Sequence, residues 1–267
     1  LLSDSTPEEL RGDCCKVRHE VRHHAITHRG LLWLTDRAAY EWTKVRRYMV
    51  PSGMVVAVLG VDGAGKSTLI NALLPTLNAA THNAVTVRHL RPTVLPALAR
   101  LRGKKSEDAG AAINPHGATP SGKLGSLLRL IYLTMDYVLG YWIWTRPKLA
   151  KQPTVVIFDR YAYDMALDPR RFRIQLPTAL VAFFTRLVPK PDLVFCLHGR
   201  PEVLAARKGE LPLAEVTRQI DSLRCWAAKQ SNAVLIATDD TVEVARDRVL
   251  LAIMDWCAKR SRKPHGN

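Results

Sequence analysis

The stretch GVDGAGKST, residues 60–68, fits the pattern G-x-x-x-x-G-K-[ST] of a phosphate-binding loop. Residues 54–59 before it (MVVAVL) are a short apolar run rich in valine, which predicts a buried parallel strand. Residues 67–77 after it have apolar side chains at helical spacing and predict a helix. The glycines therefore lie between a strand and a helix, which is the context that the pattern requires.

This loop predicts a nucleoside-triphosphate site. Glycine tolerates the dihedral angles of a tight turn, so the backbone N–H groups of residues 63–66 can point at an anion, and the following helix adds the positive end of its dipole. We expect Lys66 to reach the β- and γ-phosphates and the Ser67 hydroxyl to ligate Mg²⁺. The predicted cofactor-binding residues of the loop are Gly60, Asp62, Gly63, Ala64, Gly65, Lys66, Ser67 and Thr68.

Length and composition set the class of protein. The chain has 267 residues, 47% of them hydrophobic, which is enough for one large core with an appendage. The formal net charge of +15 predicts an acidic partner such as nucleotide phosphates, nucleic acid or an anionic surface. The five cysteines form no C-x-x-C or disulfide-like pattern, which predicts a reducing, cytoplasmic setting.

The longest apolar stretch, residues 130–145, is shorter than the roughly 20 residues that span a bilayer, and Asp136 interrupts it. We expect a buried helix here. The alternative is a membrane-facing role for Tyr141, Trp142 and Trp144, because these aromatic residues and the nearby arginines suit an interface. Contact with a membrane surface or with nucleic acid is therefore the less favoured alternative.

Residues 1–50 are polar and basic, with helical spacing from about residue 31 to residue 49, and residues 51–53 (PSG) end the segment. We expect a basic helical extension at 1–50, the main domain at 51–260 and a basic tail at 261–267. Residues 19–23 (HEVRH) fit the zinc-protease pattern H-E-x-x-H. Too little chain surrounds them for a third ligand and a supporting fold, so we expect a solvated histidine-rich helix, with a bound metal ion as the alternative.

Further strands are predicted at residues 83–89, 153–158, 192–197 and 232–237, with helical patterns between them. A segment rich in Gly, Ser, Pro and charge at 102–126 predicts a loop insertion. The interleaved order predicts an α/β fold, a five-stranded parallel sheet with helices on both faces. Ligands of such sheets bind at the carboxyl ends of the strands.

The strand predicted at 153–158 leads directly into Asp159 and Arg160. An apolar run that ends in a carboxylate is the Walker B arrangement, in which the carboxylate holds Mg²⁺ or its water. The predicted metal-binding pair is therefore Ser67 and Asp159. Arginines cluster at residues 170–173, just past this carboxylate, which favours contact with an anion over a solvated charged loop.

With these segments in order, residues 53–258 resemble the thymidylate kinase family of P-loop nucleotide kinases. GVDGAGKST is similar to the family's P-loop, and FDRY (158–161) to its Asp-Arg-Tyr motif. PDLVFCL (191–197) with RPEVLAARKGE (200–210) resembles its fourth strand and lid, and NAVLIATDDTVEVARDRV (232–249) the strand and loop that flank the adenine. More narrowly, residues 159–173 and RKGELPL (207–213) resemble a kinase-like branch often met beside bacterial surface-polysaccharide genes.

The resemblance implies ATP and Mg²⁺ as cofactors and transfer of the γ-phosphate as the activity. It implies that Asp159 assists Mg²⁺ and the acceptor, that Arg160 contacts the transferred or acceptor phosphate, and that Arg207 closes over the triphosphate. With Lys66, these are the predicted catalytic residues. Two more cofactor-binding residues are implied near the adenine, Thr238 and Asp239. The residues predicted to bind the acceptor are Arg88, Arg91, Asp136, Tyr161, Asp164, Arg170 and Arg171.

The acceptor side departs from the family pattern. RHLRPTVLP (88–96) stands where an R-E-P-G-G-T run is usual, and Asp136-Tyr137 stands where Asp-Arg is usual. The first expectation for the acceptor is a nucleoside monophosphate, and the alternative is a sugar or glycan in surface-polysaccharide metabolism. A GTPase would need an N-K-x-D signature, which the sequence lacks. A non-catalytic nucleotide-binding module is the remaining rival, and a homodimer is a further candidate assembly.

Overall fold

The structure is a computed structural model that describes residues 16–17, 31–91, 94–95, 122–208 and 212–262. The chain divides into two units, Leu1–Val50 and Pro51–Asn267. In the first unit the helix α2 (Leu31–Met49) has the bounds that the sequence predicts, and most side chains from residue 34 onwards are exposed. The histidine-rich segment 19–23, most of the predicted loop insertion and most of the basic tail lie outside the described residues.

The second unit contains one five-stranded sheet in which all neighbouring strands are parallel. The strands are β1 (Met54–Gly60), β2 (Val85–His89), β3 (Val155–Asp159), β4 (Leu193–His198) and β5 (Ala233–Ala237), in the order β2-β3-β1-β4-β5. The predicted fold class is confirmed. All seven residues of the central strand β1 are buried, because helices cover both faces of the sheet.

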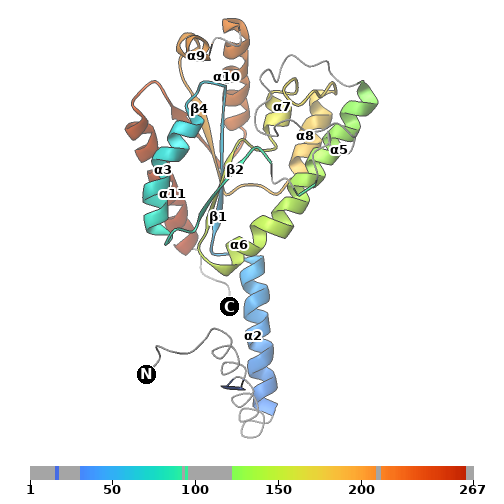
Figure 1. The fold of residues 1–267 in the computed structure, drawn as a ribbon, viewed down its shortest axis with the longest axis vertical. Helices are drawn as coiled ribbons and strands as arrows, with labels where there is room; N and C mark the ends of the chain where they lie inside the picture. The colour runs from blue at the N-terminus through green and yellow to red at the C-terminus, as the bar shows by residue number, and fades with distance from the viewer. Residues whose placement is uncertain (1–15, 18–30, 92–93, 96–121, 209–211, 263–267) are drawn as a thin grey trace. The chain divides into compact units, whose positions relative to one another are not determined.

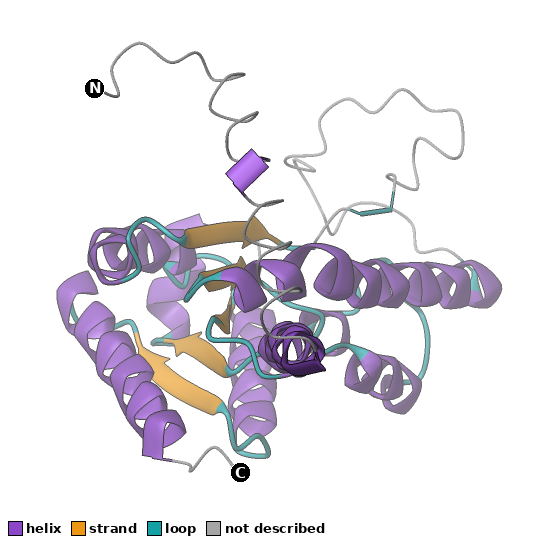
Figure 2. Cartoon of the chain, turned by 90° about the horizontal axis from the view of Figure 1, so that it is seen from below, coloured by secondary structure: helices purple, strands orange, loops and turns teal. Residues whose placement is uncertain are grey.

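Two hydrophobic clusters form the core, one on each face of the sheet. Successive side chains of a strand point to opposite faces, so Met54, Val56 and Val58 join one cluster and Val55 and Ala57 the other. The helices α3 (Lys66–Ala80) and α11 (Val242–Arg262) pack on the first face, with α5 (Lys123–Gly140) and α8 (Thr178–Leu187) on the second. Figures 1 and 2 show these two layers of helices with the sheet between them.

The helix α5 continues without a break through a π-helical turn, η1 (Tyr141–Thr145), into α6 (Arg146–Lys151). It starts inside the segment predicted as a loop insertion, and the buried Ser126 explains why. The Ser126 hydroxyl accepts a hydrogen bond from the backbone N–H of Gln175 at 3.0 Å, a contact with a distant segment that the local composition does not reveal. No helix among the described residues is both long enough and apolar enough to cross a bilayer.

Three shorter or more peripheral helices complete the second unit as described. They are α7 (Asp164–Leu167), α9 (Pro201–Lys208) and α10 (Leu213–Ala227). α7 follows β3 and α9 follows β4, so both begin at the carboxyl edge of the sheet. This edge also carries the glycine-rich loop, and it is therefore where the sequence predicts a ligand site.

Candidate nucleotide site

The glycine-rich loop joins the end of β1 to the start of α3. Gly63 and Gly65 have φ angles of +85° and +80°, a left-handed region in which glycine has no steric penalty. Gly60 is required for a different reason, since a Cβ there would lie 3.1 Å from the Cβ and the carbonyl oxygen of Leu197 on β4. The N-cap residue of α3 is Gly65, which has no side chain with which to cap the helix. The N–H groups of its first turn are thus left for an anion.

Lys66 lies folded back into this loop. Its side chain is 8% exposed, and Nζ donates hydrogen bonds to the carbonyl oxygens of Gly60 and Val61, both at 2.8 Å. Burial and the charge of Arg160 lower the pKa of Lys66 from 10.5 to about 7, against the opposing effect of nearby carboxylates. Nζ lies 3.9 Å from the carboxylate of Asp62, and an incoming phosphate would add further negative charge beside it.

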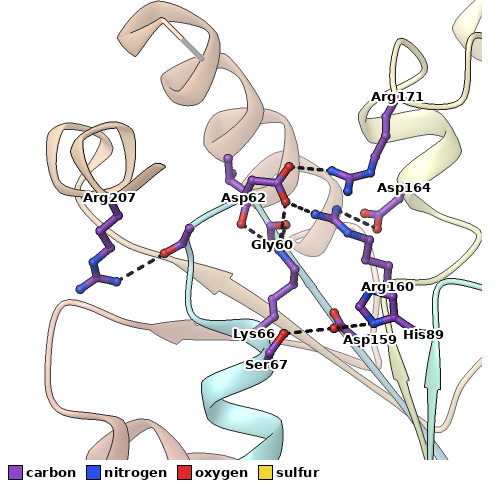
Figure 3. Close-up of polar contacts among 12 residues, drawn as sticks. Gly60, Asp62, Lys66, Ser67, His89, Asp159, Arg160, Asp164, Arg171 and Arg207 are labelled. Atoms are coloured by element: carbon purple, nitrogen blue, oxygen red, sulfur yellow. Dashed lines mark hydrogen bonds and ion pairs between the residues drawn. The ribbon is translucent and has the colours of Figure 1, made fainter. Parts of the chain in front are cut away.

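Asp62, in the middle of the loop, is the centre of an ion-pair network (Figure 3). Its carboxylate pairs with the guanidinium of Arg160 and, at 2.6 Å, with that of Arg171. Burial raises the pKa of Asp62, but Arg160, Lys66 and Arg171 outweigh this effect and lower it to about 2. Asp62 is therefore ionised at neutral pH and neutralises cations that would otherwise face one another.

Arg160 reaches this network because its backbone is left-handed, with φ at +77°. Its N–H donates to the carbonyl oxygen of Val58 at 3.0 Å, which fixes the turn after β3 to the central strand. Its guanidinium also lies 3.5 Å from the buried carboxylate of Asp164. Burial raises the pKa of Asp164, and the nearby cations only partly counter this effect.

Asp159, at the end of β3, and Ser67, in the first turn of α3, face each other. The register pairs Asp159 with Val58 on β1, and the Ser67 hydroxyl donates to Oδ2 of Asp159 at 3.4 Å (Figure 3). Oδ1 of Asp159 is buried and has no hydrogen-bond partner in the described part of the chain. Mg²⁺ usually takes one or two protein oxygens together with phosphates and waters, so this hydroxyl and this orphan carboxylate oxygen fit it.

His89, at the end of β2, is a site residue that the sequence did not single out. Its Nδ1 lies 3.0 Å from Oδ2 of Asp159, and its side chain is 72% exposed. The pairing of β2 with β3 brings the ends of both strands, and so His89 and Asp159, to this edge. Only that pairing places His89 in the site, because a lone histidine at the end of a short strand does not by itself predict a site residue.

Two large cavities adjoin the loop, in addition to a small one of about 30 Å³ beside Gly60, Val61 and Asp62. One, of about 400 Å³, is lined by Asp62, Gly63, Gly65, Lys66, Ser67, Thr68, His89, Asp159, Arg160 and Arg171. The other, of about 360 Å³, is lined by Gly63, Ala64, Gly65, Thr68, Leu69, Arg207, Thr238, Asp240, Thr241, Val242 and Ala245. The first is rich in charge and the second is more apolar. They share glycines of the loop, an arrangement suited to a ligand with a phosphate end and an apolar end.

The structure brings most of the predicted cofactor residues together at these cavities, but Asp239 has a different place. Its carboxylate accepts a hydrogen bond from the backbone N–H of Arg200 at 2.8 Å and so supports the start of α9. Asp240, Thr241 and Val242 line the second cavity in its stead. Arg207 reaches the loop from α9, with a guanidinium nitrogen 3.5 Å from the carbonyl oxygen of Gly63.

The residues predicted to bind the acceptor divide into two groups. Arg171 lines the first cavity and Asp164 contacts Arg160 beside it, as described above, and Arg88 and Arg170 line neither of the two cavities. Tyr161 is 2% exposed, its ring packs against Phe158, and its hydroxyl donates to the carbonyl oxygen of Pro189 at 2.5 Å. Tyr161 thus lies in the core and lines neither of the two large cavities.

Asp136 is also internal. It is fully buried, accepts a hydrogen bond from the backbone N–H of Leu95 at 2.7 Å and lies 3.5 Å from Arg91. The pair therefore holds the chain after β2 against α5, and its carboxylate is not directed at either cavity. The next residue, Tyr137, is buried too, and its hydroxyl donates to the carbonyl oxygen of Leu90.

The parallel sheet, the glycine-rich loop and the carboxylate at the tip of β3 together form a fold of the P-loop nucleotide-kinase type. No family model matches the chain. It is 30% identical over 165 residues to the thymidylate kinase of Xanthomonas oryzae pv. oryzae (strain PXO99A), a match of 61% of this chain and 64% of that protein. It is 28% identical over 167 residues to that of Xanthomonas campestris pv. campestris (strain B100), covering 61% and 65%. The chain thus spans less than two thirds of these relatives.

A solved thymidylate kinase structure has a similar fold. Thymidylate kinase from Ehrlichia chaffeensis superposes with a TM-score of 0.52 at 16% identity, covering 76% of this chain and all of that one. The chain is thus similar in sequence to thymidylate kinases, and it shares its fold with one of them.

Proposed function

We propose that the chain is a kinase that uses ATP and Mg²⁺ to phosphorylate a nucleoside monophosphate. The observation that carries the proposal is the 3.4 Å approach of the Ser67 hydroxyl to Asp159, next to the buried Lys66. Main-chain amides, an ammonium group and a metal-binding pair then converge where β1 and β3 end side by side. Phosphoryl transfer requires little more than this, because its catalysis is mostly positioning and neutralisation of charge.

Each part of the site has a role in this proposal. The loop amides and Lys66 hold the β- and γ-phosphates, and the second cavity takes the nucleoside. Mg²⁺ held by Ser67 and Asp159 would neutralise charge that develops on the phosphate oxygens. Arg160 and Arg171 face the same cavity and suit the acceptor phosphate, because a guanidinium group binds phosphate through two parallel hydrogen bonds.

Two observations favour ATP and a cytoplasmic setting. The sequence has no N-K-x-D signature for guanine. The cysteines that the structure describes, Cys196, Cys225 and Cys257, are free thiols, which fits a reducing compartment. A homodimer is consistent with the proposal but is not needed for it.

An acceptor screen tests the activity directly. ADP release is measured with ATP and Mg²⁺ against thymidylate, other nucleoside monophosphates and sugars side by side. Asp159→Asn should slow transfer on the order of 10²-fold or more while ATP binding stays within a few-fold. Asp255→Asn on the exposed side of α11 is the matched control and should change neither. A Lys66→Ala protein with full activity would contradict the proposal, and ATP binding with no acceptor phosphorylated would favour a non-catalytic module.

A sugar or glycan acceptor is the second candidate, favoured by one observation. At the position where the thymidylate kinase pattern has arginine after aspartate, Tyr137 is buried and its hydroxyl is used by Leu90. That position therefore offers no cation to a nucleotide phosphate. A preference for sugars over every nucleoside monophosphate in the same screen would select this candidate.

A further inference from the structure

The longest helical segment of the second unit has an apolar stripe in contact with solvent. α5, η1 and α6 form one continuous rod along the side of the unit away from α3 and α11 (Figure 1). Leu124, Leu128, Ile131 and Met135 follow one another at spacings of four, three and four residues, so they lie on one side of α5. They are 37–72% exposed. A surface helix usually turns such a stripe towards the core, whereas here another side of α5 faces the core.

The stripe leads into an aromatic cluster at η1. Trp142, Ile143 and Trp144 are consecutive, and each is 46–51% exposed. Half-exposed tryptophan is typical of a boundary between an apolar and an aqueous phase, because its ring is largely apolar and its N–H needs a polar partner. The guanidinium of Arg146 lies 5.8 Å from the ring centroid of Trp142, at the edge of this cluster.

The accessible charges of this segment are all positive. The structure describes every residue from 123 to 151, and the single acidic residue there, Asp136, is fully buried. The cations that are exposed or half-buried are Lys123, Arg129, Arg146, Lys148 and Lys151. Lysines and arginines at both ends of an apolar stripe can extend their charged groups outwards while their stems cover apolar surface.

The neighbouring helix α8 has the same character. It packs against α5, and Phe183 and Leu187 on it are 55% and 52% exposed, with Arg186 exposed between them. The fully described stretch 169–191 contains no acidic residue. Two adjacent helices thus combine exposed apolar side chains with a purely positive charge.

We propose that this basic aromatic face, formed by the exposed side chains of α5, η1, α6 and α8, docks on an anionic lipid membrane. The apolar side chains enter the boundary between headgroups and acyl chains, and the cations contact lipid phosphates. The rod then lies in the plane of the surface and does not cross the bilayer. The proposal is independent of the kinase activity, since none of these residues lines the cavities beside the loop.

Charge decides between a membrane and a second copy of the chain. A two-fold dimer through this face would bring the cations of both copies together with no exposed acid on the face to pair them, and like charges across an interface are costly. Single-stranded nucleic acid would stack on the tryptophans. Nucleic acid, however, would not cover the aliphatic stripe at Leu124, Leu128 and Ile131 with apolar groups. An anionic membrane satisfies both the apolar and the basic residues.

Vesicle co-sedimentation of the full chain tests the proposal. Vesicles of phosphatidylcholine alone are compared with vesicles that also contain phosphatidylglycerol, for the wild type and for Trp142→Ala/Ile143→Ala/Trp144→Ala. The control is Leu251→Ala/Met254→Ala, which removes similarly exposed apolar side chains from α11. We expect the wild type to bind anionic vesicles with an affinity that falls as the salt concentration rises. The affinity should be about tenfold or more lower in the triple variant and unchanged in the control. A blue shift of tryptophan emission on binding should also disappear in the triple variant.

Four results would overturn the proposal. The first is that the wild type does not bind anionic vesicles. The second is that the triple variant binds them as the wild type does, which assigns the binding to another part of the chain. A dimer in light scattering that the triple substitution dissociates, without vesicle binding, assigns the face to self-association. Binding of a single-stranded oligonucleotide that depends on the same residues, again without vesicle binding, assigns it to nucleic acid. Circular dichroism melts confirm that each variant is folded.

Discussion

Replacing Lys66 by methionine should make the ligand-free protein more stable while it abolishes nucleotide binding. The reason is that burial and Arg160 lower the pKa of Lys66 from 10.5 to about 7, so the folded protein disfavours the ammonium group. At about 1.4 kcal/mol for each tenfold change in proton affinity, the difference corresponds to roughly 5 kcal/mol. Methionine keeps the apolar stem of the side chain and removes the charge.

Part of this gain is cancelled. The two hydrogen bonds that Nζ donates, to the carbonyl oxygens of Gly60 and Val61, are lost at a cost of about 1 kcal/mol each. Loss of the weak pairing with Asp62, at 3.9 Å, removes a little more. We therefore expect Lys66→Met to raise the free energy of unfolding by about 2 kcal/mol at about pH 6.

The dependence on pH identifies the cause. Below about pH 7 the side chain is protonated in both the folded and the unfolded state, so the full penalty applies. Between about 7 and 10.5 the folded protein loses the proton first, and the wild type gains stability as the pH rises. The advantage of Lys66→Met should therefore shrink over this range.

Urea denaturation of both proteins from about pH 6 to about pH 10 measures the effect. Lys229→Met, at an exposed lysine of the same unit, is the control and should change stability by less than about 0.5 kcal/mol. Saturating ATP with Mg²⁺, at about 100 times its dissociation constant, should add about 2.7 kcal/mol to the wild type and nothing to Lys66→Met. The reasoning is refuted if Lys66→Met is the less stable protein at low pH, or if the gap between the two does not narrow with rising pH.

Three further substitutions test other parts of the structure. Asp62→Asn should lower the free energy of unfolding by about 2 kcal/mol at neutral pH, because the pKa of Asp62 is lowered from 3.8 to about 2. This loss should vanish as the pH falls through that range. Equal stability of the variant and the wild type in urea at neutral pH would contradict the prediction. Arg207→Ala should raise the KM for ATP several-fold and leave the melting temperature unchanged, since the side chain is exposed; a lower melting temperature with normal KM would assign it a structural role. Tyr137→Phe should lower the free energy of unfolding by about 1 kcal/mol, because the Leu90 carbonyl loses its hydrogen-bond donor. An unchanged urea midpoint would show that this hydrogen bond does not stabilise the fold.

The strands and their order along the chain could be predicted from the sequence because parallel strands covered on both faces appear as short, continuous apolar runs. The place of Asp159 beside Ser67 then follows from topology, since the carboxyl ends of parallel strands share one edge. The order of the strands in the sheet is less accessible. It depends on which helix covers which face, and no local pattern of the sequence records that.

The place of Tyr161 in the core follows from the backbone, and the sequence pattern does not indicate it. Side chains alternate along a strand, so Asp159 and Tyr161 should point to the same side. The left-handed conformation of Arg160 interrupts this alternation, directs the guanidinium to Asp62 and turns Tyr161 into the core. Arginine rarely adopts positive φ, so no pattern of residue types announces it.

The same network explains why the loop has a carboxylate among residues that must bind phosphate. Without a ligand, Lys66, Arg160 and Arg171 would face each other at close range in a largely buried place, and their mutual repulsion would destabilise the fold. Asp62 neutralises them from within the loop. Because Asp62 stays ionised, it also competes with any phosphate for the same three cations. The affinity of this site for its substrates therefore depends on how much more strongly these cations bind phosphate than they bind the carboxylate of Asp62. The number of cations alone does not determine it.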